Sequence, residues 1–382
     1  MSRGLPRSRA PRGSSAGARG PLILAVAVLT VGLLAGCQAA TPSDAAGSTA
    51  APASTSTPTT TGTPLPDPHS LTGASTAASI SDVVPIATDV TSVLPVTVTD
   101  EEGTKVTITD TSRILALDLY GTLAETVVGL GLADKLVGRT VSNTMASMAD
   151  LPLVTQDGHE LNGEAILKLK PTVILTDKSI GPREVQDQLR DAGVAVVFFD
   201  GSRSLATVGE QILAVGHALG VDTAAQQLAD RSEQEITDAK ADIAAMAPSD
   251  PAKKLRIAFL YVRGAGSIFF ILGKGEGADD LIDSLGAIDV ATEAGITGAR
   301  PANSEALLAI NPDLILTMTG GVESTGGLKG LLARPGVSDT TAGNNHRVVD
   351  MSDGQILSFG PTTGAVLRSL AQAIYAPTEL RP

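Results

Sequence analysis

The chain has 382 residues, 43% of them apolar and only 2% aromatic, so it carries enough aliphatic side chains for the cores of two domains. Its net charge of −13 argues against nucleic-acid binding, which needs a basic surface to replace phosphate counterions. A single cysteine excludes a disulfide within the chain and any multi-cysteine zinc or iron–sulfur site.

The first 36 residues, 1–36, differ from the rest, because they hold several arginines and no acidic residue. The apolar run from Pro21 to Ala35 suits a secretory signal and is shorter than the roughly 20 residues of a membrane-spanning helix. It ends in Leu34-Ala35-Gly36-Cys37, which resembles the lipobox of bacterial lipoproteins; the alternative is a buried cysteine of the signal region. The resemblance implies a mature chain that starts at lipidated Cys37 and is anchored to the outer face of the cell membrane.

A low-complexity segment follows the cysteine. Residues 38–64 are Ser, Thr, Pro, Ala and Gly apart from Gln38 and Asp44, and the bias fades slowly towards residue 94. Such a composition cannot bury a core, so we expect a flexible tether over residues 37–94, with His69 solvated.

From residue 95 onward, short apolar runs alternate with amphipathic stretches, which predicts α/β lobes with parallel sheets. The first lobe, 95–222, opens with two alternating strands around Glu102-Gly103 and continues with strands at 113–117, 172–176 and 194–199 and helices at 122–130, 183–192 and 205–219. Residues 223–246 predict one linking helix of about 36 Å, which Pro248 ends. The second lobe, 247–382, has predicted strands at 255–262, 314–318 and 347–351 and helices at 279–285, 304–309, 328–333 and 363–375.

An internal repeat relates the two lobes. Residues 161–176 read LNGEAILKLKPTVILT and residues 302–317 read ANSEALLAINPDLILT. The identical pairs include Asn162 with Asn303 and Glu164 with Glu305. A generic helix–proline–strand pattern explains the shared leucines and proline, but it leaves Asn-x-Glu in both copies unexplained.

The lipobox, the tether, the two α/β lobes, the single linking helix and the repeated Glu-x-x-Leu-x-x-x-Pro-x-x-Ile-Leu segment together resemble the substrate-binding lipoproteins of ABC importers for iron-siderophores, haem and cobalamin. The resemblance covers residues 95–382 and implies a class III periplasmic binding protein with a ligand cleft between two Rossmann-like lobes. In that family one exposed glutamate on each lobe docks with arginines of the permease, and Glu164 and Glu305 match those positions. The alternative is two solvated glutamates that the helix dipole favours.

Two further segments indicate the ligand. His159 lies in a Gly-His-Glu-Leu-Asn sequence just before the first repeat. Tyr261, which Arg263 follows at a spacing of two, lies at the end of a predicted buried strand, where α/β folds place ligand contacts. Both segments resemble the haem-binding lipoproteins of actinobacterial haem importers. The resemblance implies His159 and Tyr261 as ligands of the haem iron, with Arg263 bonded to the tyrosine oxygen and Met318 in the haem pocket. Imidazole and phenolate are both known haem ligands.

Other candidates stay open at this level. Tyr120 and Met351 are candidates for the pocket or for packing, His217 fits a structural role and His346 a turn. Candidate cations for binding the haem propionates are Arg139, Lys178 and Arg300, but the sequence does not assign any of them to this role.

We therefore expect a non-enzymatic, monomeric protein that captures haem outside the cell and passes it to an ABC permease and its ATPase. An iron-siderophore or cobalamin receptor of the same fold is the alternative, and the absence of tryptophan argues against a siderophore pocket. A surface adhesin would explain the lipid and the tether but not the repeat. An enzyme is disfavoured because the Gly-x-Ser-x-Gly, phosphate-loop and His-Glu-x-x-His motifs are absent.

Overall fold

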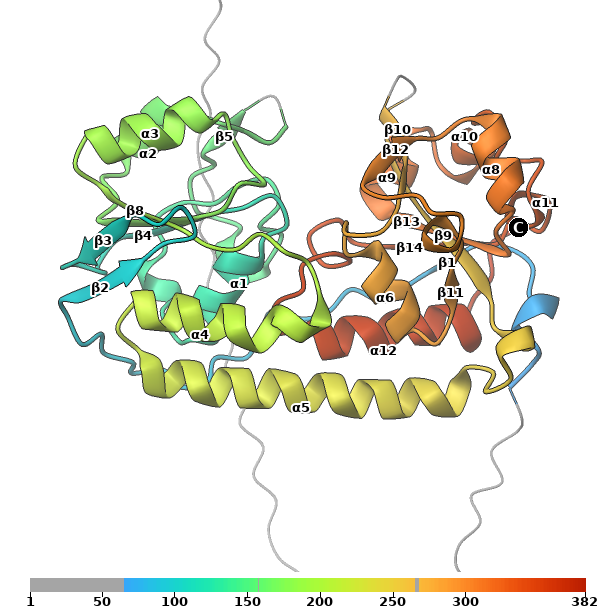
Figure 1. Ribbon diagram of the computed structural model, residues 1–382, viewed down its shortest axis with the longest axis horizontal. Coiled ribbons are helices and arrows are strands. Elements are labelled where there is room, and N and C mark those ends of the chain that lie inside the picture. Colours follow the sequence, from blue (N-terminus) through green and yellow to red (C-terminus); the bar gives the residue numbers. More distant parts are fainter. Residues whose placement is uncertain (1–64, 157, 265–267) are drawn as a thin grey trace, which may run out of the picture. The chain divides into compact units, whose positions relative to one another are not determined.

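The computed structural model describes residues 65–156, 158–264 and 268–382, which form two α/β lobes joined by helix α5 (Figure 1). Cys37 and the proposed signal lie outside the described residues. Within this part of the chain, no helix is both long and apolar enough to cross a membrane.

The N-terminal lobe is built on a parallel sheet in the order β4 (Ile114–Leu117), β7 (Val173–Thr176), β8 (Ala195–Phe198). β4 and β7 are buried along their whole length, as expected for a parallel sheet covered by helices on both faces. The lobe also has the hairpin β2 (Val96–Thr99)–β3 (Lys105–Ile108) and the shorter hairpin β5 (Thr155–Gln156)–β6 (Glu160–Leu161). Its helices are α1 (Thr122–Gly129), α2 (Gly163–Lys168), α3 (Arg183–Asp191) and α4 (Val208–Ala218).

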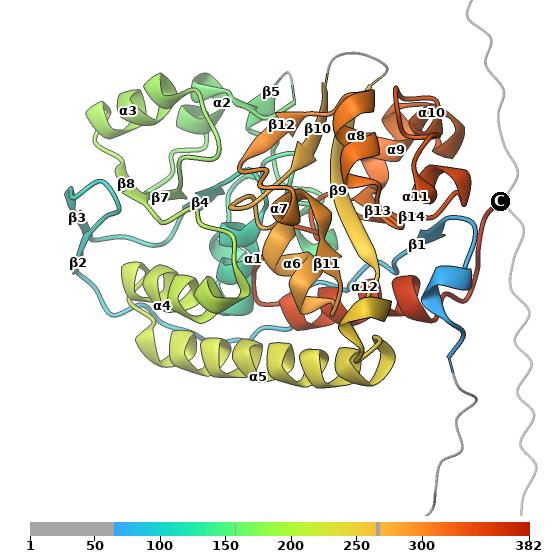
Figure 2. The same cartoon turned by 45° about the vertical axis from the view of Figure 1, so that its right-hand side comes forward.

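The C-terminal lobe contains a seven-stranded sheet, surrounded by helices (Figure 2). The strand order is β1 (Ser75–Thr76), β14 (Val348–Met351), β13 (Leu314–Met318), β9 (Arg256–Arg263), β10 (Ile268–Leu272) and β12 (Ala299–Pro301), with β11 (Ile288–Asp289) paired to β9. Its helices are α6 (Ala278–Ser284), α7 (Val290–Glu293), α8 (Ser304–Ile310), α9 (Thr319–Ser324), α10 (Leu328–Leu332), α11 (Thr341–Asn344) and α12 (Thr363–Tyr375). Short 3-10 turns occur at Pro68–Ser70, Ala133–Lys135, Ala146–Met148, Leu205–Thr207 and Pro251–Lys253.

The three strands that the sequence predicted for this lobe, β9, β13 and β14, are parallel as expected, but the sheet is mixed because it also contains strands that the sequence did not predict. β10 and β12 run antiparallel to their neighbours. The run Ile268–Leu272 is continuous and apolar, so nothing in its periodicity distinguishes a hairpin partner from a buried parallel strand.

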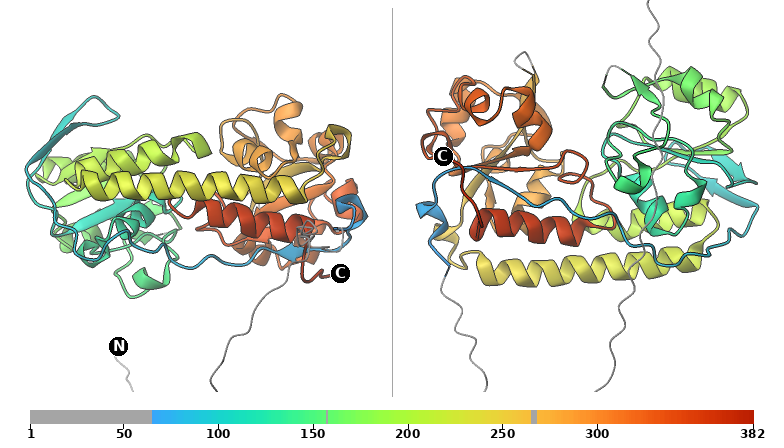
Figure 3. Two further views of the ribbon diagram at one scale, coloured as in Figure 1. Left: turned by 90° about the horizontal axis from the view of Figure 1, so that it is seen from below. Right: turned by 180° about the vertical axis from the view of Figure 1, so that it is seen from behind.

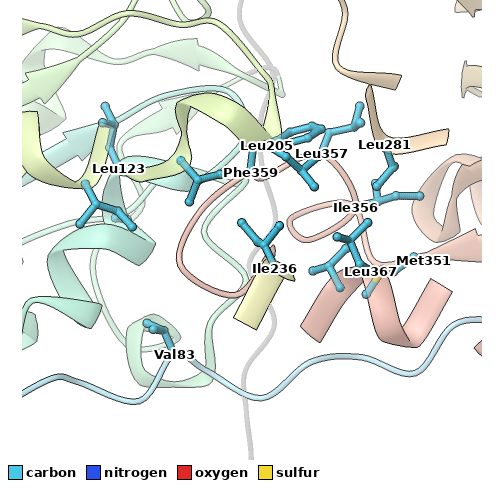
Figure 4. Close-up of a cluster of buried hydrophobic side chains, with 14 of the residues drawn as sticks. Val83, Leu123, Leu205, Ile236, Leu281, Met351, Ile356, Leu357, Phe359 and Leu367 are labelled. Atoms are coloured by element: carbon cyan, nitrogen blue, oxygen red, sulfur yellow. The ribbon is translucent and has the colours of Figure 1, made fainter. Parts of the chain in front are cut away.

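Helix α5 (Asp222–Met246) crosses under both lobes and packs against α4 of one lobe and α12 of the other (Figures 1 and 3). The observed helix starts one residue before the predicted 223–246. One hydrophobic cluster runs through both lobes and α5; it joins Ile236 of the helix to Leu205 of the N-terminal lobe and Phe359 of the loop before α12 (Figure 4). The lobes therefore share a core beneath the cleft.

The tether expected over residues 37–94 ends earlier than the sequence indicated, because residues 65–94 lie against the folded lobes. Ser75–Thr76 form β1 at the edge of the second sheet, Ala77 is buried, and Val83 packs beside α1 of the first lobe. The side chains that make these contacts are small or isolated apolar ones, so the composition of residues 65–94 resembles that of a linker. The side chain of His69 is exposed as predicted, and its Nε2 atom lies 3.1 Å from the carbonyl oxygen of Lys253.

Candidate functional site

His159 stands at the tip of the β5–β6 hairpin, where Gly158 takes a left-handed backbone conformation (φ 93°) that makes the tight turn possible. The imidazole is half-buried, and its Nδ1 lies 3.3 Å from Oγ of Ser142. Burial lowers the pKa of His159, and the positive charge of Arg263 lowers it further, while Asp353 opposes the shift. The shift favours the neutral ring, which keeps a lone pair for a metal ion.

Tyr261 and Arg263 lie on the same face of β9, because side chains two residues apart in a strand point to the same side. Both are half-buried, while Val262 between them faces the core on the other side. The guanidinium carbon of Arg263 lies 4.9 Å from the centroid of the Tyr261 ring. Tyr261 faces Phe270 across the β9–β10 pair.

Asp353 holds Arg263 in this position. Its Oδ2 accepts a hydrogen bond of 2.6 Å from Nη2 of Arg263, and its Oδ1 accepts one of 2.8 Å from the backbone amide of Gly320. The same Nη2 lies 3.2 Å from the sulfur of Met318, the last residue of β13. Strands β9 and β13 and the loop after β14 thus converge on one group at their carboxyl ends, as expected for α/β folds.

These side chains line one cavity of about 470 Å³ between the lobes, a volume within the range of small-molecule sites. Both lobes contribute, and most lining groups are apolar or aromatic. The lining residues are Leu119, Tyr120, Val141, Ser142, Thr144, Gly158, His159, Tyr261, Arg263, Phe270, Leu272, Glu276, Ala299, Met318, Asp353, Gly354 and Leu357. The structure therefore brings His159, Tyr261, Arg263 and Met318 together, although they are far apart in the sequence.

A buried charge cluster supports Tyr120 at the cavity wall. The guanidinium carbon of Arg203 lies 4.5 Å from the centroid of the Tyr120 ring, and its Nη2 donates to Oδ2 of Asp177 at 2.9 Å. Asp118 lies next to this pair, with 3.8 Å between its Oδ2 and the same Nη2. Burial raises the pKa of Asp118 to about 6, and the charge of Asp177 adds to the shift while Arg203 opposes it. Arg203, which Asp177 holds in place, contacts the Tyr120 ring and so positions it at the cavity wall.

Several other sequence candidates lie elsewhere. Met351 is fully buried in the shared core, and His217 pairs with Asp222, with 2.9 Å between Nδ1 and Oδ1. The cations Arg139, Lys178 and Arg300 are not among the lining residues. Another hollow of about 380 Å³ beside β2 is lined by His217, Asp100 and Glu101, but it contains neither the tyrosine nor the arginine of the cleft.

The sequence reasoning missed Ser142, Asp353 and Gly354. Asp353 lies two residues after the carboxyl end of β14, a position that the α/β rule marks for ligand contacts, so that rule was the available signal. Ser142 and Gly354 belong to loops of different lobes, and their proximity depends on the tertiary fold.

Glu164 and Glu305 occupy equivalent places in the two lobes. Each stands in the first turn of a short helix, α2 or α8, and each is exposed. Both helices begin with an asparagine cap: Oδ1 of Asn162 accepts from the amide of Ala165 at 3.0 Å, and Oδ1 of Asn303 from that of Ala306 at 2.9 Å. Capping therefore accounts for the repeated asparagine, which the sequence had left unexplained.

Comparison with known proteins gives consistent matches. A family model described as periplasmic binding protein matches residues 118–353. The crystal structure of the heme binding protein HmuT is 47% identical, covers 81% of this chain and 100% of that protein's chain, and superposes with a TM-score of 0.79. The periplasmic heme-binding protein RhuT from Roseiflexus sp. RS-1 is 33% identical over 70% of this chain and 98% of its own, with a TM-score of 0.64.

A curated relative agrees with these structures. The uncharacterized ABC transporter substrate-binding lipoprotein YvrC of Bacillus subtilis (strain 168) is 28% identical over 291 residues, which are 75% of this chain and 88% of the relative.

Proposed function

This chain belongs to the periplasmic binding protein family, and from that premise we propose that it captures haem in the cavity between its lobes and delivers it to the permease of an ABC importer. Two α/β lobes joined by one long helix are the class III architecture of that family. Members of the family are ligand carriers, so the assignment is a binding protein and not an enzyme.

The observation that carries the haem assignment is the meeting of His159 and Tyr261 in one cavity, each contributed by its own lobe. A neutral imidazole and a tyrosine oxygen are both ligands that haem iron accepts. The apolar lining from Leu119, Phe270 and Leu272 suits the flat hydrophobic face of a porphyrin. Tyr261 and Arg263 are the second ligand and its cationic neighbour in this proposal, and Met318 completes the pocket wall.

The solved structures of HmuT support the choice of residues. They include variants in which a histidine, a tyrosine and an arginine two positions after that tyrosine are each replaced by alanine. The same three residue types occur here in the same order, with Arg263 two positions after Tyr261. We assign His159, Tyr261 and Arg263 to these places.

Titration of the purified protein with hemin tests this function. We expect one equivalent of hemin to bind, with a shifted Soret band that a ferric siderophore or cobalamin in excess does not reverse. Displacement of hemin by either competitor would move the assignment to the siderophore or cobalamin receptors of the same fold.

The permease contact is assigned to Glu164 and Glu305. Both side chains are exposed, and within the described residues neither forms an ion pair. Changing both to arginine should impair haem uptake by cells while hemin binding in vitro stays unchanged. Glu210→Arg, at an exposed residue of helix α4, is the matched control. Normal uptake by the double variant would reject these two residues as the contact.

The membrane anchor is assigned to Cys37, the single cysteine of the chain. Cys37→Ser should abolish lipid attachment and release the protein, as a monomer, from the outer face of the membrane into the medium. Retention of the variant in detergent-free membrane washes would contradict this assignment.

A further inference from the structure

The structure accounts for most identities of the internal repeat. The asparagines cap their helices, and the alanines that follow, Ala165 and Ala306, are partly buried, which favours a small side chain. The prolines, isoleucines and the leucines of β7 and β13 are buried. The threonines at the strand ends are buried too, where Thr176 Oγ1 donates to the carbonyl oxygen of Leu117 and Thr317 Oγ1 to that of Leu260. Folding alone therefore explains these matches.

Two matched pairs remain without such a reason, and both are exposed. One is the glutamate pair, and the other is Leu167 with Leu308, whose side chains are 46% and 48% exposed. A leucine that is about half exposed gives the isolated lobe only part of the packing energy of a buried one, and single exposed leucines are common on protein surfaces. Here, however, the exposed leucine occurs at the same place in both lobes, beside the same exposed acid.

The geometry places each leucine next to its glutamate. Glu164 and Leu167 are three residues apart on α2, as Glu305 and Leu308 are on α8, so each pair shares one helix face. On each helix, the residue just before the leucine, Ile166 on α2 and Leu307 on α8, points into the core of its lobe and is fully buried. Both helices lie on the side of their lobes away from α5 (Figure 1).

We infer that Leu167 and Leu308 are the apolar half of the permease-docking surface, one acid–leucine pair on each lobe. The inference rests on the proposed function, which supplies the permease as partner. The surface of the permease that matches these pairs carries, at two places, a cation flanked by an apolar side chain. An exposed ion pair contributes little because water and salt screen it. A leucine that excludes water on docking strengthens the pair and adds a contribution that salt does not weaken.

The test uses the haem-loaded protein and the purified permease–ATPase complex with which it supports uptake, held in lipid nanodiscs. Leu167→Ala and Leu308→Ala are each expected to weaken binding about fivefold, and the double variant by roughly the product, because the sites lie on different lobes. Leu213→Ala, at a leucine 36% exposed on α4, is the matched control and should bind like the unaltered protein. The hemin spectrum should not change in any of these variants, and the thermal midpoint should fall only slightly and by similar amounts in the three single variants.

Salt separates the two contributions. Raising the ionic strength from about 0.05 M to about 0.5 M should shrink the effect of the Glu164→Arg and Glu305→Arg changes and leave the effect of the leucine changes intact. If the double leucine variant binds the complex as tightly as Leu213→Ala while the glutamate variants lose binding, the leucine surface is refuted and the proposed docking stands. If the glutamate variants also bind normally, the docking part of the proposed function falls with it.

Discussion

Gly354 sits where the two lobes touch at the floor of the cavity, and a methyl group there should disturb both stability and the site. A Cβ built on Gly354 would lie 2.5 Å from Oγ1 of Thr144 and 2.6 Å from the carbonyl oxygen of Ser142. Gly354 belongs to the loop after β14, whereas Ser142 and Thr144 belong to the other lobe. The missing side chain therefore permits the close approach of the lobes.

The magnitude follows from these distances. Ordinary van der Waals contact begins near 3.4 Å, so the loop of Ser142 has to retreat by about 0.8 Å. Overpacking of this kind costs about 1–3 kcal/mol, which corresponds to a fall of about 2–6 °C in the thermal midpoint for a domain of this size. The same shift moves Ser142 Oγ away from the Nδ1 atom of His159, so we expect hemin affinity to fall about tenfold.

The assay compares Gly354→Ala with Gly201→Ala in thermal unfolding and hemin titration. Gly201 is the control because a Cβ there meets nothing closer than 3.4 Å and its backbone is not left-handed. Equal midpoints and equal hemin affinities for the two variants would refute the argument that the missing side chain of Gly354 permits the close approach of the lobes.

Two other predictions concern charged groups. Glu102 accepts hydrogen bonds from Arg183, which lowers its pKa from 4.5 to about 2, with a smaller contribution from Arg190. The ionised carboxylate therefore stabilises the fold above about pH 4.5, and this effect is lost as the pH falls through about 2. Glu102→Gln should reduce the free energy of unfolding by about 1–2 kcal/mol at pH 7 and by much less near pH 2, as denaturant titrations can check. Asp353→Ala removes the 2.6 Å bond to Arg263 and should weaken hemin binding about tenfold in a titration, so an unchanged affinity would show that Arg263 needs no support.

Much of the architecture was accessible from the sequence. The linking helix, the alternating elements and the repeat rest on periodicity over many residues, which is the strongest local signal. The resemblance to haem-binding lipoproteins indicated Tyr261, Arg263 and His159, and the structure places all three at one cavity.

The remainder depends on contacts distant in the chain. β1 is two residues long, and its pairing with β14 has no periodicity to reveal it. The position of Asp353 just after the end of a strand could have indicated a ligand contact, but its partner Arg263 is 90 positions away in the sequence. The approach of Gly354 to Ser142 arises only when both lobes are folded, so no local pattern encodes it.

The single variants at the proposed iron ligands should differ in their spectra. Tyr261→Ala should remove any phenolate-to-iron charge-transfer band. His159→Ala should keep that band and loosen hemin binding, because only the imidazole is lost. Identical spectra for the two variants would contradict distinct roles for these residues.

The most direct test of the account is the absorption spectrum of the double variant His159→Ala/Tyr261→Ala in the presence of hemin. We predict that both contacts to the iron are lost, so that the Soret band resembles that of hemin free in the same buffer and hemin is removed by gel filtration. A double variant that retains hemin with the spectrum of the unaltered protein would contradict the claim that the cleft binds haem through these two residues.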